Sequence, residues 1–124
     1  MKKGLFLDDE RLVSDVSWIV YPEENIKWTV VRCYESFKEE VENQSYDYYS
    51  FDHDIQDFDD PLKERTGYDC VKYLVEHLLE ELLHLGYSPE NIQCFFHTQN
   101  IIGKENMEKY WENFKELRRE LLHD

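Results

Sequence analysis

The chain has 124 residues and a formal net charge of −14, with 34% charged and 15% aromatic residues. This length fits a single domain, residues 1–124, and the aromatic content argues against a disordered chain. The negative charge excludes a broad binding surface for duplex nucleic acid or for an anionic membrane.

The first half of the chain predicts three strands and one helix. The strands are expected at residues 4–7, 27–32 and 47–51, which are short apolar, β-branched or aromatic runs. Residues 10–26 are mixed in character and predict only a helical turn or two around residues 12–19. Residues 34–43 predict a helix, because Phe37 and Val41 lie one helical turn apart.

The second half predicts two longer helices that flank a fourth strand. The motif TGYD at residues 66–69 has the form of a capping box, and the apolar stripe after it predicts a helix ending at Gly86. The Ser-Pro pair at residues 88–89 indicates a turn, and residues 92–96 predict the strand. A last helix is expected from about Glu105. Its apolar positions are Met107, Tyr110, Trp111, Phe114, Leu117 and Leu121.

Strands that alternate with helices indicate an α/β fold with a parallel sheet and helices on its faces. In such a sheet, the residues that follow the carboxyl ends of the strands gather at one edge. Acidic clusters follow two of the strands, at residues 8–10 and 52–54. If those strands are neighbours, their carboxylates repel one another unless a cation lies between them or one of them is protonated.

This edge of the sheet is therefore a candidate metal site. Carboxylate oxygens favour Mg²⁺ or Mn²⁺ over Zn²⁺. The expected ligands are Asp9 and Asp52, with Asp8 and the backbone carbonyl of Asp54 behind them. The alternative is that these acids are solvated loop residues. That is what we expect of the next acids along the chain, which lack the spacing of a calcium loop: Asp57, Asp59 and Asp60.

Polar side chains suited to phosphate chemistry follow the strands at the same edge. His53 and His97 could transfer protons as base and acid across a bound phosphate, since histidine titrates near neutral pH. Each could equally be a packing or hydrogen-bonding residue. Thr98 and Asn100 supply uncharged donors for phosphate oxygens. Arg11 is the favoured cation for the phosphate, with a surface salt bridge as its alternative.

The sequence also bears on the cellular compartment. No apolar stretch is long enough to span a membrane or to form the core of a signal peptide. Cys33, Cys70 and Cys94 are widely spaced and fit reduced thiols better than disulfides or a zinc site. We therefore expect a cytoplasmic protein.

Five motifs occur in order along the chain: LFLDDER at residues 5–11, FDHD at 51–54, TGYD at 66–69, HTQN at 97–100 and GKENM at 103–107. Together they resemble the cyclic-phosphate processing receiver family, an offshoot of the response-regulator receiver domain, over nearly the whole chain. The resemblance implies a flavodoxin-like, three-layer fold with about four parallel strands in the order 2-1-3-4. It also implies that Asp8 and Asp9 match the receiver's acidic pair, Asp52 its phosphoacceptor position and Thr98 its hydroxyl residue.

Two departures from an ordinary receiver stand out. Only one helix follows the fourth strand, so we expect the usual fifth strand and its phosphate-pairing lysine to be missing, and Lys104 is not in an equivalent position. Leu12 and Val13 stand where the family usually has a proline soon after the acidic motif. Phosphorelay signalling through Asp52 is therefore a minor alternative.

Two functions are compatible with these residues. The first is a metal-dependent hydrolase, a phosphodiesterase that opens a cyclic nucleotide or the 2′,3′-cyclic phosphate end of an RNA, with His97, His53 and Asp52 in the chemistry. The second is a non-catalytic receiver-like module that keeps an acidic metal pocket and binds a partner protein. The aromatic residues of its last helix, residues 110–114, could form a homodimer interface or could equally cover the fourth strand.

Overall fold

The computed structural model describes residues 1–86 and 91–122, so the turn expected at residues 88–89 lies outside the described residues. The strands are β1 (Lys2–Leu7), β2 (Ile26–Val31), β3 (Tyr48–Phe51), β4 (Asp57–Asp60), β5 (Lys63–Arg65) and β6 (Gln93–Phe96). The helices are α1 (Tyr34–Asn43), α2 (Gly67–Leu85) and α3 (Ile101–Leu122), and a short 3-10 turn, η1, spans Val13–Asp15. None of the described helices has the length and apolar character that crossing a membrane requires.

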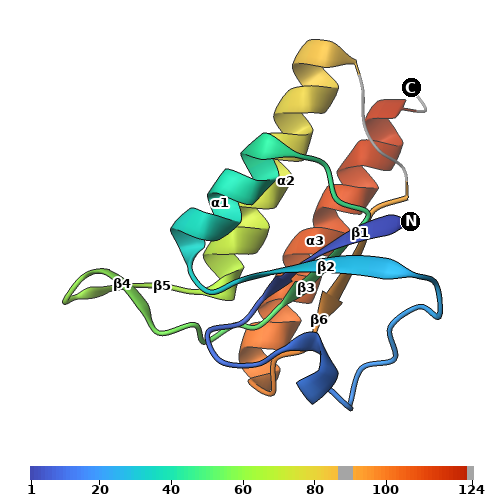
Figure 1. Cartoon of the computed structure of the whole chain (residues 1–124). Coiled ribbons are helices and arrows are strands. Elements are labelled where there is room, and N and C mark those ends of the chain that lie inside the picture. Colours follow the sequence, from blue (N-terminus) through green and yellow to red (C-terminus); the bar gives the residue numbers. More distant parts are fainter. Residues whose placement is uncertain (87–90, 123–124) are drawn as a thin grey trace.

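The main sheet is parallel and confirms the receiver-like strand order. Its four strands lie in the order β2-β1-β3-β6, so β6 takes the place of the predicted fourth strand (Figure 1). Leu7 at the end of β1 pairs with Val31 of β2 and with Phe51 of β3, and Phe51 pairs with Phe96 of β6. The strands therefore end in register, and the residues that follow them start from one line across the sheet.

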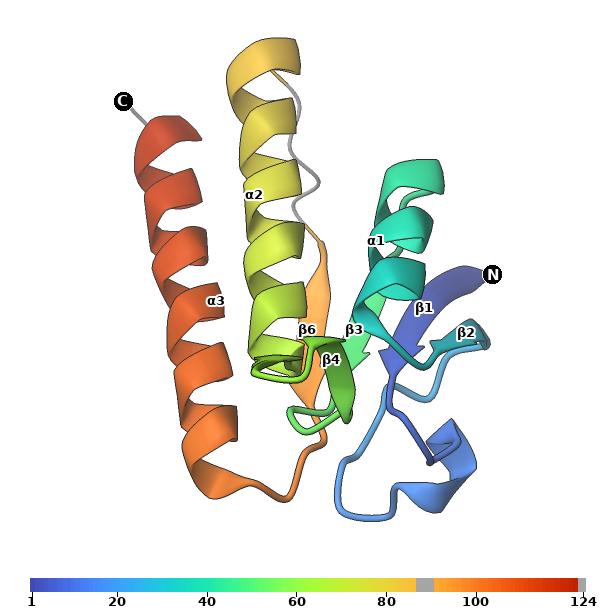
Figure 2. The same ribbon diagram turned by 90° about the vertical axis from the view of Figure 1, so that its left-hand side faces the viewer.

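All three helices share one hydrophobic core on one face of the sheet. Leu5, Leu7 and Phe51 point into this core, together with apolar residues of α1, α2 and α3. Phe37 and Val41 of α1 are both buried there, as their spacing predicts. Helix α2 lies between α1 and α3 (Figure 2).

The second face of the sheet departs from the three-layer arrangement that the resemblance implies. Among the described residues it is covered by the segment that joins β1 to β2, which contains η1 and lies below the sheet in Figure 1. Tyr21 of this segment packs against Trp28 and Phe95, with ring centroids 5.2 Å apart in both pairs. The reason lies in residues 10–26, which lack the apolar periodicity of a crossover helix.

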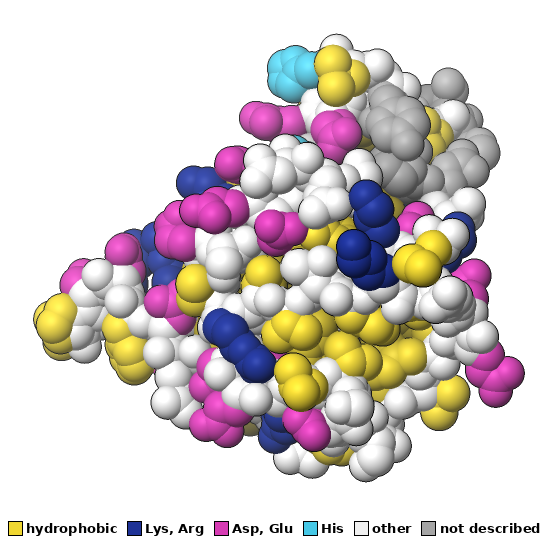
Figure 3. All heavy atoms as spheres, viewed as in Figure 1, with side chains coloured by type: hydrophobic (Ala, Val, Ile, Leu, Met, Phe, Trp, Pro, Cys, Tyr) yellow, Lys and Arg dark blue, Asp and Glu magenta, His cyan; other side chains and the backbone are white. Residues whose placement is uncertain are grey.

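The acidic segment after β3 is not the simple solvated loop that was expected. Strands β4 and β5 pair as an antiparallel hairpin. It projects from the left of the molecule, with hydrophobic side chains at its tip (Figures 1 and 3). Asp57 corrects the prediction most clearly, because its Oδ2 accepts a 2.8 Å hydrogen bond from the N–H of Tyr34 at the first turn of α1. Asp59 and Asp60 are exposed, as expected.

The long helices confirm their predicted apolar faces but not every boundary. In the capping box of α2, Asp69 Oδ2 accepts a 2.8 Å hydrogen bond from the N–H of Thr66, and the helix ends at Gly86 as predicted. Helix α3 begins at Ile101, before the expected start at Glu105. Asn100 causes the earlier start, because its Oδ1 accepts a 3.0 Å hydrogen bond from the N–H of Gly103 in the first helical turn.

Candidate functional site

The sheet itself positions three of the candidate residues. Asp8, Asp52 and His97 each come directly after a strand, and the backbone hydrogen bonding of the sheet continues through them. Asp8 N–H donates to the carbonyl of Val31 at 3.1 Å, and Asp52 N–H donates to the carbonyl of Leu7 at 3.0 Å. His97 N–H donates to the carbonyl of Phe51 at 3.0 Å. Their side chains therefore start from fixed backbone positions.

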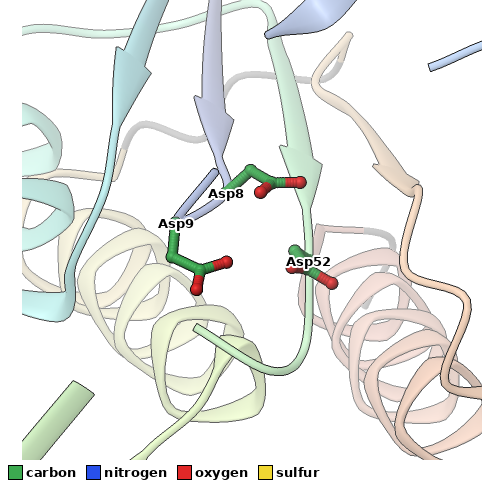
Figure 4. A group of neighbouring side chains, drawn as sticks. All are labelled: Asp8, Asp9 and Asp52. Carbon is green, nitrogen blue, oxygen red and sulfur yellow. The ribbon is translucent and has the colours of Figure 1, made fainter. Parts of the chain in front are cut away.

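The predicted convergence of carboxylates is confirmed. Asp8, Asp9 and Asp52 each offer an oxygen, and these oxygens lie within 4.8 Å of one another (Figure 4). Burial, and then the charge of Asp8, raise the pKa of Asp52. Burial also raises the pKa of Asp9, and the charges of Asp8 and Glu10 add to this effect. Holding the three acids together is therefore electrostatically unfavourable, and a bound cation would reduce the repulsion between them.

Asp8 is the most strongly held of the three acids. Its side chain is fully buried, and burial alone would raise its pKa. Three hydrogen bonds outweigh this effect and keep the pKa of Asp8 well below its usual range. Oδ1 accepts from the N–H groups of Glu10 at 2.9 Å and Arg11 at 2.8 Å, and Oδ2 lies 3.0 Å from Nε2 of His97. Asp8 is therefore ionised near neutral pH.

Arg11 supplies a positive charge to the acidic cluster. Its Nη1 lies 3.3 Å from Oδ2 of Asp8 and 3.9 Å from Oδ2 of Asp52. The guanidinium also lies over the ring of Trp18, 5.3 Å from the ring centroid. The side chain of Arg11 is 33% exposed, so this is the partner of Asp8 that solvent can reach and a ligand can replace.

His97 does not face the place where a phosphate would bind. Its side chain is fully buried and stacks on Phe6, with centroids 4.4 Å apart and planes inclined by 7°. Its Nε2 contacts Asp8, and its Nδ1 lies 2.8 Å from Oγ of Ser50. The expectation of direct proton transfer to substrate by His97 is corrected here, because the ring has no exposed edge and lies behind Asp8.

His53 is also held away from the acidic cluster. Its Nδ1 lies 2.9 Å from Oδ1 of Asp54, and this contact is the main cause of the lowered pKa of Asp54. Its ring packs so closely on α3 that a Cβ at Gly103 would lie 2.5 Å from it. Glycine is similarly required at position 67, where a Cβ would lie 1.8 Å from the carbonyl oxygen of Asp52.

A polar pocket of about 180 Å³ opens beside the carboxylates. Neither histidine is among its lining residues, and among the described residues Arg11 is the one basic side chain that lines it. A typical site for a whole small-molecule ligand is larger, at roughly 300–1,000 Å³, so this pocket has room for only a small group. It is lined by Asp9, Glu10, Arg11, Asp52, Asp54, Gln56, Thr98, Gln99 and Asn100.

The polar residues after β6 are divided between the pocket and the surrounding structure. Thr98 donates a side-chain hydrogen bond that lowers the pKa of Asp52 and partly offsets the larger effect of burial. Asn100 lines the pocket, but its Nδ2 donates to Oδ2 of Asp54 at 3.0 Å while its Oδ1 caps α3. Asn100 therefore fastens α3 to the loop after β3. Its sequence position directly before a helix is the signal for this capping role.

Some pocket residues were not predicted from the sequence. Glu10 and Gln99 sit inside motifs that were recognised, yet neither was singled out as a site residue. Gln56 has a positive φ of 49°, a conformation that non-glycine residues seldom adopt and that sequence patterns do not reveal. Arg65 of β5 does not line the pocket, and it pairs with Asp59 at 3.5 Å and packs over the ring of Tyr34.

Comparison with known proteins agrees with this geometry. No curated protein matches the chain. The family model described as the cyclic-phosphate processing receiver domain matches residues 3–113, which include all of β1 except Lys2, the whole of β3 and β6, and every residue that lines the pocket. The chain therefore belongs to the cyclic-phosphate processing receiver family.

Proposed function

We propose that this protein is a metal-dependent phosphodiesterase, a hydrolase that opens a cyclic phosphate. The substrate class is a cyclic nucleotide or the 2′,3′-cyclic phosphate end of an RNA. The observation that carries the proposal is the cluster of Asp8, Asp9 and Asp52 beside a small polar pocket, which Asp9 and Asp52 line. Membership of a receiver family associated with cyclic-phosphate processing supports the choice of substrate.

The donor set fits a hard divalent cation. All three clustered side chains are carboxylates, which suits Mg²⁺ or Mn²⁺. Asp9 and Asp52 would be direct ligands, supported by Asp8 and by the backbone carbonyl of Asp54. When bound, the ion polarises a phosphoryl oxygen and lowers the pKa of a bound water. The raised pKa values of Asp9 and Asp52 show that the cluster carries unfavourable negative charge, which such an ion would compensate.

The remaining pocket residues have distinct roles in the proposal. Arg11 and Thr98 would bind phosphate oxygens, since both line the pocket and both already contact Asp52. Asn100 would support that surface by tying Asp54 to the start of α3. His97 acts on the site only through Asp8. His53 likewise acts through Asp54 and Asn100, which it contacts at 2.9 and 3.4 Å.

The test of this function is ³¹P NMR of a panel of cyclic phosphates with purified protein and Mg²⁺ or Mn²⁺. We expect the resonance of at least one cyclic phosphate to disappear with the wild type and to persist with Asp52→Asn. Asp59→Asn is the matched control, because it makes the same change in an exposed hairpin acid. Turnover that is equal in all three proteins would contradict the proposal.

A non-catalytic binding module is the second candidate. An apolar groove of about 220 Å³ lies between α2 and α3, lined by Val75, Leu79, Tyr110, Asn113, Phe114 and Leu117. The aromatic homodimer surface considered for α3 is mostly core, since Trp111 and Phe114 are buried against the sheet. A partner, including a second copy, would therefore meet Leu117 and Leu121, which are about 40% exposed. Absence of turnover across the whole panel, with metal binding intact, would favour this candidate.

A further inference from the structure

A chain of hydrogen-bonded side chains runs behind the pocket on the second face of the sheet. Tyr21 Oη lies 2.7 Å from Ser50 Oγ, which lies 2.8 Å from Nδ1 of His97, and Nε2 of His97 lies 3.0 Å from Oδ2 of Asp8. Ser50, His97 and Asp8 are fully buried. The chain thus links the segment between β1 and β2 to the acidic cluster through β3 and the end of β6.

The direction of these hydrogen bonds follows from the chemistry of the groups. An ionised carboxylate only accepts, so Nε2–H of His97 must donate to Asp8. In a neutral imidazole the other nitrogen accepts, so Nδ1 takes a hydrogen bond from the Ser50 hydroxyl. Ser50 Oγ can then accept from Tyr21 O–H. Every member of the chain is satisfied in this arrangement, which is what burial of a polar network requires.

Two further contacts hold His97 in place, one at its ring and one at its backbone. Phe6 stacks on its flat face at 4.4 Å, and Trp18 Nε1–H donates a 2.7 Å hydrogen bond to the backbone carbonyl of His97. Trp18 and Tyr21 both belong to the segment between β1 and β2, which also provides Arg11. The same segment therefore supplies the cation at the front of Asp8 and Tyr21, the outer end of the hydrogen-bond chain at its back.

We infer that Ser50 and Tyr21 are positioning residues that fix His97 in its Nε2–H tautomer and thereby set the orientation of the Asp8 carboxylate in the acidic cluster. The expected effect on metal affinity rests on the proposed function. The tautomer of His97 does not, because it is a property of the metal-free protein. Groups that contact a metal ligand from behind contribute about 10- to 100-fold to metal affinity, and this range is an upper bound for Ser50, which reaches Asp8 only through His97. Ser50 touches the ring directly and Tyr21 acts one step further away, so Ser50 should have the larger effect.

The experiment is ¹⁵N NMR of the ring nitrogens of His97 in ¹⁵N-histidine-labelled, metal-free protein, assigned by comparison with His97→Gln. The wild type should show an acceptor-type Nδ1 and an N–H-type Nε2. Ser50→Ala should move the Nδ1 signal, and Tyr21→Phe should move it less in the same direction. Tyr48→Phe is the matched control, because it also removes a tyrosine hydroxyl, but one that donates to Glu24 and not to the chain that ends at His97.

An Nδ1–H tautomer in the wild type, or a ring with a proton on both nitrogens, would overturn the inference. So would ring signals in Ser50→Ala and Tyr21→Phe that match those of Tyr48→Phe. If Ser50→Ala does not fold, the wild-type tautomer and the Tyr21→Phe variant still test the inference, because Tyr21 is only half-buried.

A Mn²⁺ titration of the same variants separates this inference from the proposed function. Affinity should fall in Ser50→Ala, by no more than the about 10- to 100-fold typical of a direct partner of a metal ligand, and by a smaller factor in Tyr21→Phe. Equal affinity in Ser50→Ala and Tyr48→Phe would overturn the consequence for metal binding. Failure of the wild type itself to bind Mn²⁺ would contradict the proposed function and leave the ring signals as the test of the hydrogen-bond chain.

Discussion

Asp52→Asn should make the metal-free protein more stable at pH 7 and, at the same time, weaken Mn²⁺ binding by more than about 100-fold. The loss of affinity follows because a direct ligand should matter more than the surrounding residues, which typically contribute about 10- to 100-fold. The gain in stability follows because burial and the charge of Asp8 disfavour a negative charge on Asp52 in the folded state.

The pH dependence fixes the sign of this effect. A carboxyl whose pKa is raised by folding binds more protons in the folded state, so stability falls as pH rises through the interval between the unfolded and folded pKa values. Asp52→Asn removes that decline. The midpoint temperature of the variant, measured with EDTA, should therefore exceed that of the wild type by a margin that grows as pH rises from about 4 to 7.

Asp54→Asn is the control of opposite sign. The hydrogen bond from His53 lowers the pKa of Asp54. The charge of Asp54 therefore stabilises the fold at pH values above the usual pKa of a carboxyl group, and that contribution is lost as the pH falls through the lowered pKa. Asp54→Asn should leave stability at pH 7 equal or lower, whereas Asp52→Asn should raise it. A lower midpoint temperature for Asp52→Asn at pH 7 would contradict the account of a mutually repelling cluster.

Arg11→Gln should bind Mn²⁺ about tenfold more tightly than the wild type, which corresponds to about 1.4 kcal/mol. The reason is that the Arg11 guanidinium lies 3.3 Å from Asp8 and 3.9 Å from Asp52, where it opposes a second cation. The gain should shrink at high salt, since the side chain is one-third exposed. Turnover of the cyclic phosphate should fall roughly 100-fold, because a charged donor to the phosphate is lost.

Arg32→Gln is the matched control for Arg11→Gln. The Arg32 guanidinium also lies beside this loop, but its Nη1 donates to the backbone carbonyls of Asp8 at 3.1 Å and Arg11 at 2.8 Å. Its removal should change Mn²⁺ affinity much less than removal of Arg11. Isothermal titration of the three proteins makes the comparison, and weaker Mn²⁺ binding by Arg11→Gln would mean that Arg11 supports the ion instead of competing with it.

The strands and the acids that follow them could be predicted because both depend on local sequence, whereas the strand order was implied by the family resemblance. Short apolar runs that stop at acids mark the ends of β1 and β3, and the parallel arrangement brings Asp8 and Asp52 to one edge. The capping box at Thr66 and the apolar stripe of α2 are equally local signals. The strand ends, the capping box and the helical stripe each needed only residues of one segment, and the meeting of Asp8 with Asp52 needed the strand order as well.

The roles of the histidines could not be predicted, because they depend on distant residues. His97 is buried by Phe6 and bonded to Ser50, which lie 91 and 47 positions earlier in the sequence. The same limit explains Asp57, whose partner at the start of α1 lies 23 positions away. One signal was present in the sequence: Ser50 is a lone polar residue inside the buried strand β3, and such a residue needs a hydrogen-bond partner.

The most direct test of the metal site is to locate Mn²⁺ by paramagnetic broadening of backbone amide signals. Location matters because acidic side chains are scattered over the surface, and the net charge is −14 (Figure 3). At substoichiometric Mn²⁺, the amides of Asp9, Asp52 and Thr98 should broaden first in the wild type and should remain sharp in Asp52→Asn. Broadening that begins at the acids of the β4–β5 hairpin, or that is the same in both proteins, would contradict a metal site at the carboxyl edge of the sheet.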